Sequence, residues 1–174
     1  MKTLALSLLI AFSTLAVCAQ NKTSKTVKKT FTDKETGFQL TYPDSVVAVI
    51  LKNNEDIKDN VEPFVIEVYN QKQAKKLDSI TGGCYKFDEV HKNKHKVVMK
   101  EFSCEEGAAG SLYYTFLYTI EKGNYTILIK FLHRHENAFT DKKGKPIPFT
   151  KKKDMRWATD IIESAQFVKQ AIKG

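Results

Sequence analysis

Hydrophobic and polar residues alternate along much of this chain with the two-residue period of β-strands. The longest alternation predicts two strands at residues 112–120 and 125–134, joined by a tight turn at residues 122–124. A tight hairpin brings the large apolar side chains of both strands onto one face. These side chains are Leu112, Tyr114, Phe116, Tyr118, Ile120, Tyr125, Ile127, Ile129 and Phe131. We therefore predict that this face lies in the hydrophobic core.

The opposite face of this hairpin mixes apolar and polar side chains. Leucines lie there among threonines and basic residues, namely Leu117, Leu128, Leu132, Thr115, Thr119, Thr126, Lys130 and Arg134. Apolar side chains in such a row are seldom left in water, so we expect a second helix or another subunit to cover this face.

Five shorter strands are predicted at residues 38–42, 46–51, 64–69, 84–90 and 96–104. The first alternates apolar and polar residues and ends at Pro43, and the next two are continuous apolar runs. The last two flank a polar loop at residues 91–95. Their order along the chain predicts an antiparallel sheet made largely of hairpins.

Two helices complete the expected fold. Residues 71–80 are good helix formers between a capping Asn70 and a glycine pair. A second helix is predicted to begin near Asp154, because apolar residues recur there at helical spacing. These are Met155, Ala158, Ile161, Ile162 and Ala165. We predict an α+β domain at residues 31–170, in which helices flank an antiparallel β-sheet.

The first 19 residues have the pattern of a cleavable signal peptide. Lys2 provides a positive charge, and residues 4–17 are uncharged and mostly apolar but too few to span a bilayer. Cleavage after residue 19 would leave a polar leader at residues 20–30. The alternative is a lipoprotein anchored at Cys18, and the bulky Val17 counts against it. We expect a periplasmic or secreted protein, which would contact a membrane only if Cys18 is lipidated.

Removal of Cys18 with the signal peptide leaves an even number of cysteines. In an oxidising compartment we expect Cys84 and Cys104 to form a disulfide. A hairpin centred on Lys94 would place these two residues directly opposite one another. The predicted pairs are Asp88 with Lys100, Val90 with Val98, and Cys84 with Cys104.

The chain is basic, and its basic residues gather in one segment. The formal net charge is +8, but arginine is almost absent, so nucleic acid is not an expected partner. A long loop before the last helix carries Lys142, Lys143, Lys145, Lys151, Lys152, Lys153 and Arg156. We expect this loop to contact an anionic partner, either a protein or an envelope component; the alternative is a solvated loop.

The histidines form two sequence pairs that suit zinc or copper. His133 and His135 lie two residues apart near a strand end, whereas His91 and His95 flank the predicted hairpin loop. A metal site would need a third ligand brought close by folding. In the predicted register His133 lies on the core face opposite Leu112, where a structural role is the competing interpretation.

Enzymatic activity is not expected. The sequence contains no Gly-x-Ser-x-Gly motif, no tight metal-ligand motif and no glycine-rich loop that would hold a phosphate. Adjacent acids such as Glu105 and Glu106 would point to opposite faces of a strand, so they do not form a catalytic pair. We predict a protein without a cofactor.

Short motifs at both ends of the predicted domain resemble those of the PsbP, DcrB and Mog group. These motifs are Gly37-Phe38 and Tyr42-Pro43 in the first strand, and Ser164 and Phe167 after the last helix. The resemblance implies an antiparallel sheet sandwiched between helices and a non-enzymatic accessory or binding role. It assigns no ligand residue. The chain departs from the group because no tryptophan follows Pro43, and Trp157 is its only one.

Overall fold

The computed structural model describes residues 27–52, 62–70, 84–108, 111–136, 142–145 and 147–169. The predicted signal peptide at residues 1–19 lies outside the described residues. So do most of the predicted leader and the predicted helix at residues 71–80. The described part is mostly β-structure with two short helices, so the predicted antiparallel sheet is confirmed.

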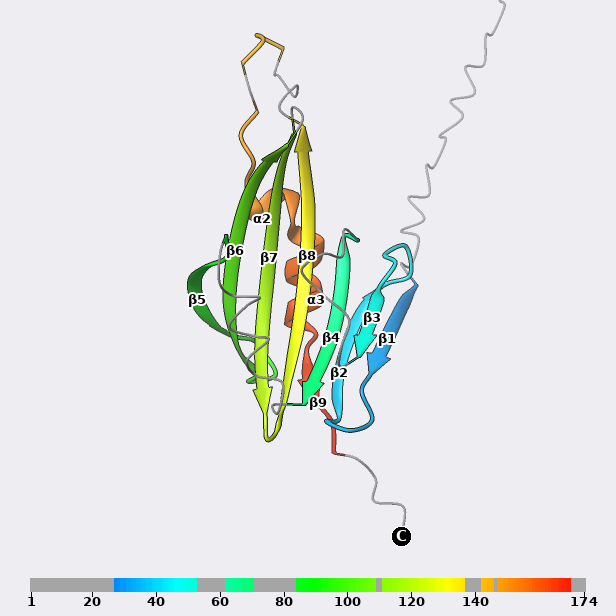
Figure 1. Cartoon of the computed structure of the whole chain (residues 1–174). Coiled ribbons are helices and arrows are strands. Elements are labelled where there is room, and N and C mark those ends of the chain that lie inside the picture. The colour runs from blue at the N-terminus through cyan, green and yellow to red at the C-terminus, as the bar shows by residue number, and fades with distance from the viewer. Residues whose placement is uncertain are drawn as a thin grey trace, which may run out of the picture.

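A six-stranded sheet dominates the molecule (Figure 1). Its strands, in spatial order, are β3 (Val49–Lys52), β4 (Phe64–Asn70), β8 (Tyr125–Glu136), β7 (Ser111–Lys122), β6 (Val98–Ala108) and β5 (Lys86–Lys92). Neighbouring strands are antiparallel except for β3 and β4, which are parallel. Strand β3 begins three residues later than the apolar run at residues 46–51 predicts.

A second, three-stranded sheet has the order β1-β2-β9. It consists of β1 (Lys28–Thr32), β2 (Phe38–Pro43) and β9 (Gln166–Phe167). Strand β1 starts at Lys28, three residues before the predicted start of the domain at residue 31. The hydrophobic pattern did not predict this edge strand, because its side chains are mostly exposed and it is held by backbone hydrogen bonds to β2.

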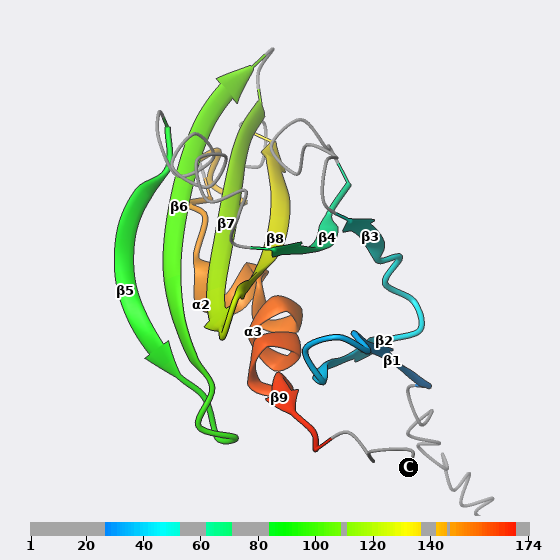
Figure 2. The same ribbon diagram turned by 60° about the horizontal axis from the view of Figure 1, so that its bottom comes forward.

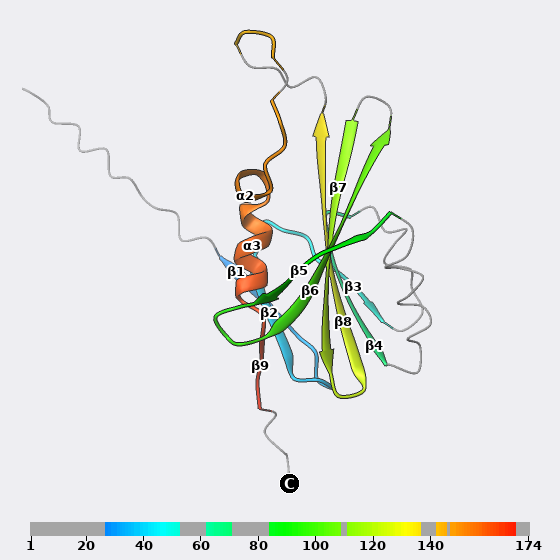
Figure 3. The same cartoon turned by 90° about the vertical axis from the view of Figure 1, so that its left-hand side faces the viewer.

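The two helices lie on one face of the large sheet, as Figures 2 and 3 show. Helix α2 (Lys151–Asp154) starts three residues before the predicted helix, and α3 (Arg156–Glu163) follows after a break at Met155. The predicted apolar stripe is confirmed, since all of its residues are buried. They are Met155, Ala158, Ile161, Ile162 and Ala165. The described helices therefore cover a single face of the sheet.

The main core lies between the large sheet, the helices and strand β2. The β7–β8 hairpin turns within the predicted residues 122–124, with Gly123 and Asn124 as its loop, and Gly123 adopts a left-handed φ of 57° there. Its predicted apolar face packs in this core, as predicted. The core side chains of the hairpin are Phe116, Tyr118, Ile120, Ile127, Ile129 and Phe131.

The second face of the large sheet also carries a buried cluster. Leu117 and Leu128 are fully buried there, and Leu51, Val65 and Tyr69 join them. The charged side chains of Glu67 and Lys130 are buried on this face as well. The expectation that something covers the mixed face of the hairpin therefore agrees with the burial of its leucines.

The predicted register of the β5–β6 hairpin is wrong. The observed pairs are Lys92 with Val98, His91 with Met99, Val90 with Lys100, Glu89 with Glu101, Phe87 with Phe102 and Lys86 with Ser103. The turn is centred one residue later than predicted, on His95, and a bulge at Asp88 then shifts the pairing.

Asn93 explains the position of this turn. Its side-chain oxygen accepts hydrogen bonds from the backbone N–H groups of His95 and Val97, each at 3.0 Å. Its side-chain nitrogen donates to the backbone oxygens of Ile162 and Ala165, at 3.0 and 2.8 Å. The turn is therefore fixed by contacts with the C-terminal end of α3, which local sequence does not reveal.

Candidate functional site

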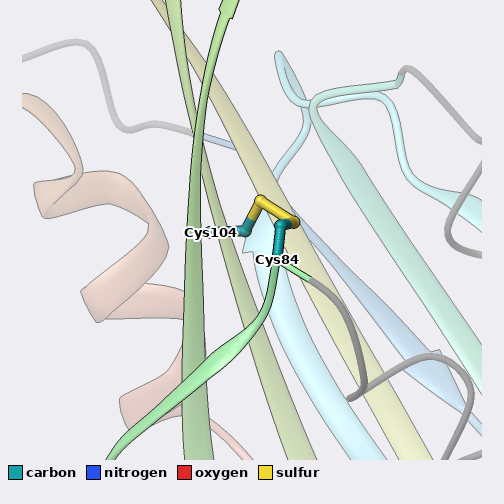
Figure 4. The surroundings of a disulfide bond; sticks show 2 residues. All are labelled: Cys84 and Cys104. Carbon is teal, nitrogen blue, oxygen red and sulfur yellow. A yellow bond between two sulfur atoms is a disulfide. The ribbon is translucent and has the colours of Figure 1, made fainter.

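The disulfide between Cys84 and Cys104 is confirmed (Figure 4). The two Cα atoms are 5.3 Å apart, within the usual range for such a bond. Cys84 precedes the first residue of β5, so it reaches Cys104 although the strand register differs from the predicted one. The bond joins the start of the edge strand β5 to β6, on the sheet face that carries Leu117.

The predicted basic segment lies beside one end of the large sheet. Its residues 142–145 form the orange tip above the sheet in Figure 1, and α2 lies below them. All but one of its cationic side chains are exposed, namely Lys142, Lys143, Lys145, Lys152, Lys153 and Arg156. The exception, Lys151, is partly buried and points toward the sheet.

Phe149 anchors the middle of this segment to the sheet. Its ring stacks on Tyr114 with 3.9 Å between centroids, and it lies 5.2 Å from the ring of His133. The backbone oxygen of Ile147, two residues before Phe149, lies 2.9 Å from Nε2 of His135. These contacts hold the chain on the sheet immediately before the cations of α2.

Lys151 provides a second anchor. Its ammonium group forms an ion pair with Glu101, whose side chain is 1% exposed. The same nitrogen lies 4.7 Å from the ring centroid of Phe116 and 5.7 Å from that of Tyr118. Lys151, which was predicted to contact an anionic partner, therefore makes its contacts within the protein.

His133 and His135 contact the basic segment, through Phe149 and Ile147. His133 lies on the core face as predicted, but it pairs with Tyr114, whereas His135 pairs with Leu112. Burial is the main reason why the pKa of His133 is lowered; nearby Asp154 opposes this effect and His135 adds to it. Among the residues that the structure describes, the two histidines do not join a third candidate ligand.

A different group of metal-ligating side chains is brought together at the β5 edge. Glu89, His91 and Glu101 place one ligand atom each within 4.8 Å of one another. The sequence pattern suggests a pair of His91 with His95, but His95 is not in this group. The two glutamates were missed because only the observed register places Glu89 opposite Glu101.

Tyr118 closes this cluster from the core side. Its ring centroid lies 5.7 Å from that of His91, and its hydroxyl lies near the carboxylate of Glu101. Burial, followed by the nearby charge of Glu101, raises the pKa of Tyr118 far above its usual value. The phenol therefore keeps its proton and stays neutral beside the buried carboxylate.

A surface pocket of about 520 Å³ has no histidine in its lining. It is lined mainly by apolar side chains, at Pro43, Ser45, Val46, Val47, Glu62, Pro63 and Trp157.

No helix in the described part of the chain is long and apolar enough to cross a membrane.

No protein-family model matches this chain, and no curated protein matches it either. Among solved structures, it is similar to a crystal structure from Bacteroides thetaiotaomicron VPI-5482, with 15% sequence identity and a TM-score of 0.37. The matched region covers 82% of this chain and 42% of the other, so this chain spans less than half the length of that neighbour. A likeness this weak assigns neither a family nor an activity.

Proposed function

We propose that this chain is an exported, non-enzymatic accessory or binding protein of the bacterial cell envelope. Its basic segment, residues 142–156, would contact an anionic envelope component. The signal-peptide pattern at residues 1–19 and the disulfide both support an oxidising compartment outside the cytoplasm. The absence of a catalytic motif from the sequence supports a binding role.

The observation that carries this proposal is that an anchored stretch of chain displays exposed cations. Phe149 and Lys151 hold the segment on the sheet, whereas Lys142, Lys152 and Lys153 point into solvent. A segment held in this way loses less conformational entropy on binding than a freely moving loop would. The many lysines suit a surface of distributed negative charge rather than a single planar group.

The finer fold assignment also belongs to this proposal. A sandwich like that of the PsbP, DcrB and Mog group would place helices on both faces of the large sheet. The burial of Leu117 and Leu128 supports a cover on the second face. The short motifs at Gly37 and Ser164 support the group itself, and Ser164 bonds to the backbone of Thr41 in β2.

Charge removal in the segment tests the proposal. We would replace Lys142, Lys152, Lys153 and Arg156 by glutamine and sediment the mature protein with envelope fragments from its own host. Each cation near an anionic surface contributes about 1 kcal/mol, so binding should fall at least tenfold. Binding of the unaltered protein should also weaken between about 0.05 and about 0.5 M salt.

A matched variant controls for net charge. Lys34, Lys86, Lys92 and Lys169 are exposed lysines outside the segment, and replacing these four by glutamine removes the same charge. This variant should bind like the unaltered protein. Equal losses in the two variants, or binding that ignores salt, would show that the segment is not the contact surface.

A further inference from the structure

The group formed by Glu89, His91 and Glu101 lies on the helix-covered face of the sheet, at its β5 edge. Each residue offers one atom that zinc accepts as a ligand, and these atoms lie within 4.8 Å of one another. We propose that this group binds a zinc ion, with a water molecule as the fourth ligand. The site is separate from the anion-contacting role proposed above and does not depend on it.

The positions of the ligand atoms suit a tetrahedral ion. Nε2 of His91 lies 3.4 Å from a carboxylate oxygen of Glu89 and also contacts Oε2 of Glu101. Zinc bonds of about 2.1 Å at tetrahedral angles separate neighbouring ligand atoms by about 3.4 Å. The pair Glu89 and His91 already has this spacing, and the ligand atom of Glu101 lies within 4.8 Å of both.

The two carboxylate oxygens of Glu101 have different contacts. Oε1 accepts a hydrogen bond from Nζ of Lys151, and Oε2 faces His91. A zinc ion bound to Oε2 therefore leaves the anchor of the basic segment in place. Because Glu101 is 1% exposed and Lys151 pairs with its Oε1, this carboxylate is held before any ion arrives.

Local charge favours a divalent cation. The two carboxylates contribute two negative charges and Lys151 one positive charge, so the site keeps a net charge of −1 when the imidazole is neutral. One imidazole with two carboxylates suits zinc better than magnesium or calcium, which prefer oxygen ligands alone. The side chain of Glu89 is 64% exposed, so an ion and its water can enter from solvent.

Calorimetric titration of the metal-free mature protein with zinc chloride tests the site, and native mass spectrometry counts the ions. We expect one ion per chain. Replacing Glu89→Gln or His91→Gln should weaken zinc binding at least about tenfold, because each change removes a direct ligand. Glu89 is exposed, so its variant should fold normally, which circular dichroism will verify.

Two control variants locate the ion. Glu105→Gln removes a nearby exposed carboxylate on β6, and the double variant His133→Gln with His135→Gln removes the other histidine pair. Both should bind zinc like the unaltered protein. The proposal is overturned if zinc does not bind, if Glu89→Gln binds unchanged, or if only the double variant loses binding. Envelope binding measured with a chelator present tests the proposed function separately.

Discussion

Lys151 and Glu101 form an ion pair that joins the first residue of α2 to a buried carboxylate of β6, 50 residues earlier in the chain. This pair places the start of the helical segment over β6, next to the edge strand β5. It also explains why α2 begins before the apolar stripe of α3, since Lys151 is held by charge and by aromatic rings rather than by apolar packing.

Replacing Lys151→Met should lower the free energy of unfolding by about 3 kcal/mol. The change leaves a buried carboxylate without its cation, which typically costs 3–5 kcal/mol; the low end applies because Lys151 is about one third exposed. Urea denaturation followed by circular dichroism measures the effect. Lys152→Met changes an exposed neighbour and should shift stability by less than about 0.5 kcal/mol. Equal effects of the two changes would show that the ion pair does not contribute.

The disulfide should contribute a similar amount. Replacing both Cys84 and Cys104 by serine removes a bond that closes a loop of 20 residues, and chain entropy then predicts a loss of about 3 kcal/mol. Urea denaturation of the double variant measures this loss. The unaltered protein with a reducing agent should unfold at the same urea concentration as the variant. A variant as stable as the oxidised protein would contradict the prediction.

Alternation alone predicted the faces of the long hairpin correctly. In β7 and β8 a tight turn of two residues fixes the register, and the alternating apolar residues then define the core face. Alternation alone did not predict that the opposite face is also buried, because Leu117 and Leu128 lie there among polar residues. The disulfide was predictable because Cys84 and Cys104 are the only cysteines outside the predicted signal peptide.

The β5–β6 hairpin shows where sequence reasoning fails. Its register depends on a bulge at Asp88 and on a turn that Asn93 fixes through atoms 69 and 72 residues away. An error in that register moves Glu89 away from Glu101 and hides the candidate zinc site. Local patterns do not encode such distant contacts, so the cluster became visible only in the folded chain.

Asn93 should therefore be among the most sensitive polar positions. Asn93→Ala removes the side-chain hydrogen bonds to the backbone oxygens of Ile162 and Ala165, and we expect a loss of about 2–3 kcal/mol in urea denaturation. Asn93→Asp keeps the acceptor for the N–H groups of His95 and Val97 but removes the donor. If the donor contacts matter, the aspartate variant should be no more stable than the alanine variant. Recovery of stability in the aspartate variant would assign the effect to the turn alone.

Stability should fall as the solution becomes more acidic, and His133 should contribute to that fall. Burial against Phe149 lowers the pKa of His133 below its ordinary value of 6.5, and this effect exceeds the opposing effect of Asp154. The unfolded chain therefore binds more protons at this position below about pH 6.5, so the contribution is complete above that pH and is lost as the pH falls. His133→Gln removes the titrating group while keeping a polar side chain. The stability difference between the unaltered protein and this variant, measured by urea denaturation, should shrink from about pH 7.5 to about pH 5.5. A difference that stays constant over this range would mean that His133 is equally protonated in the folded and unfolded states.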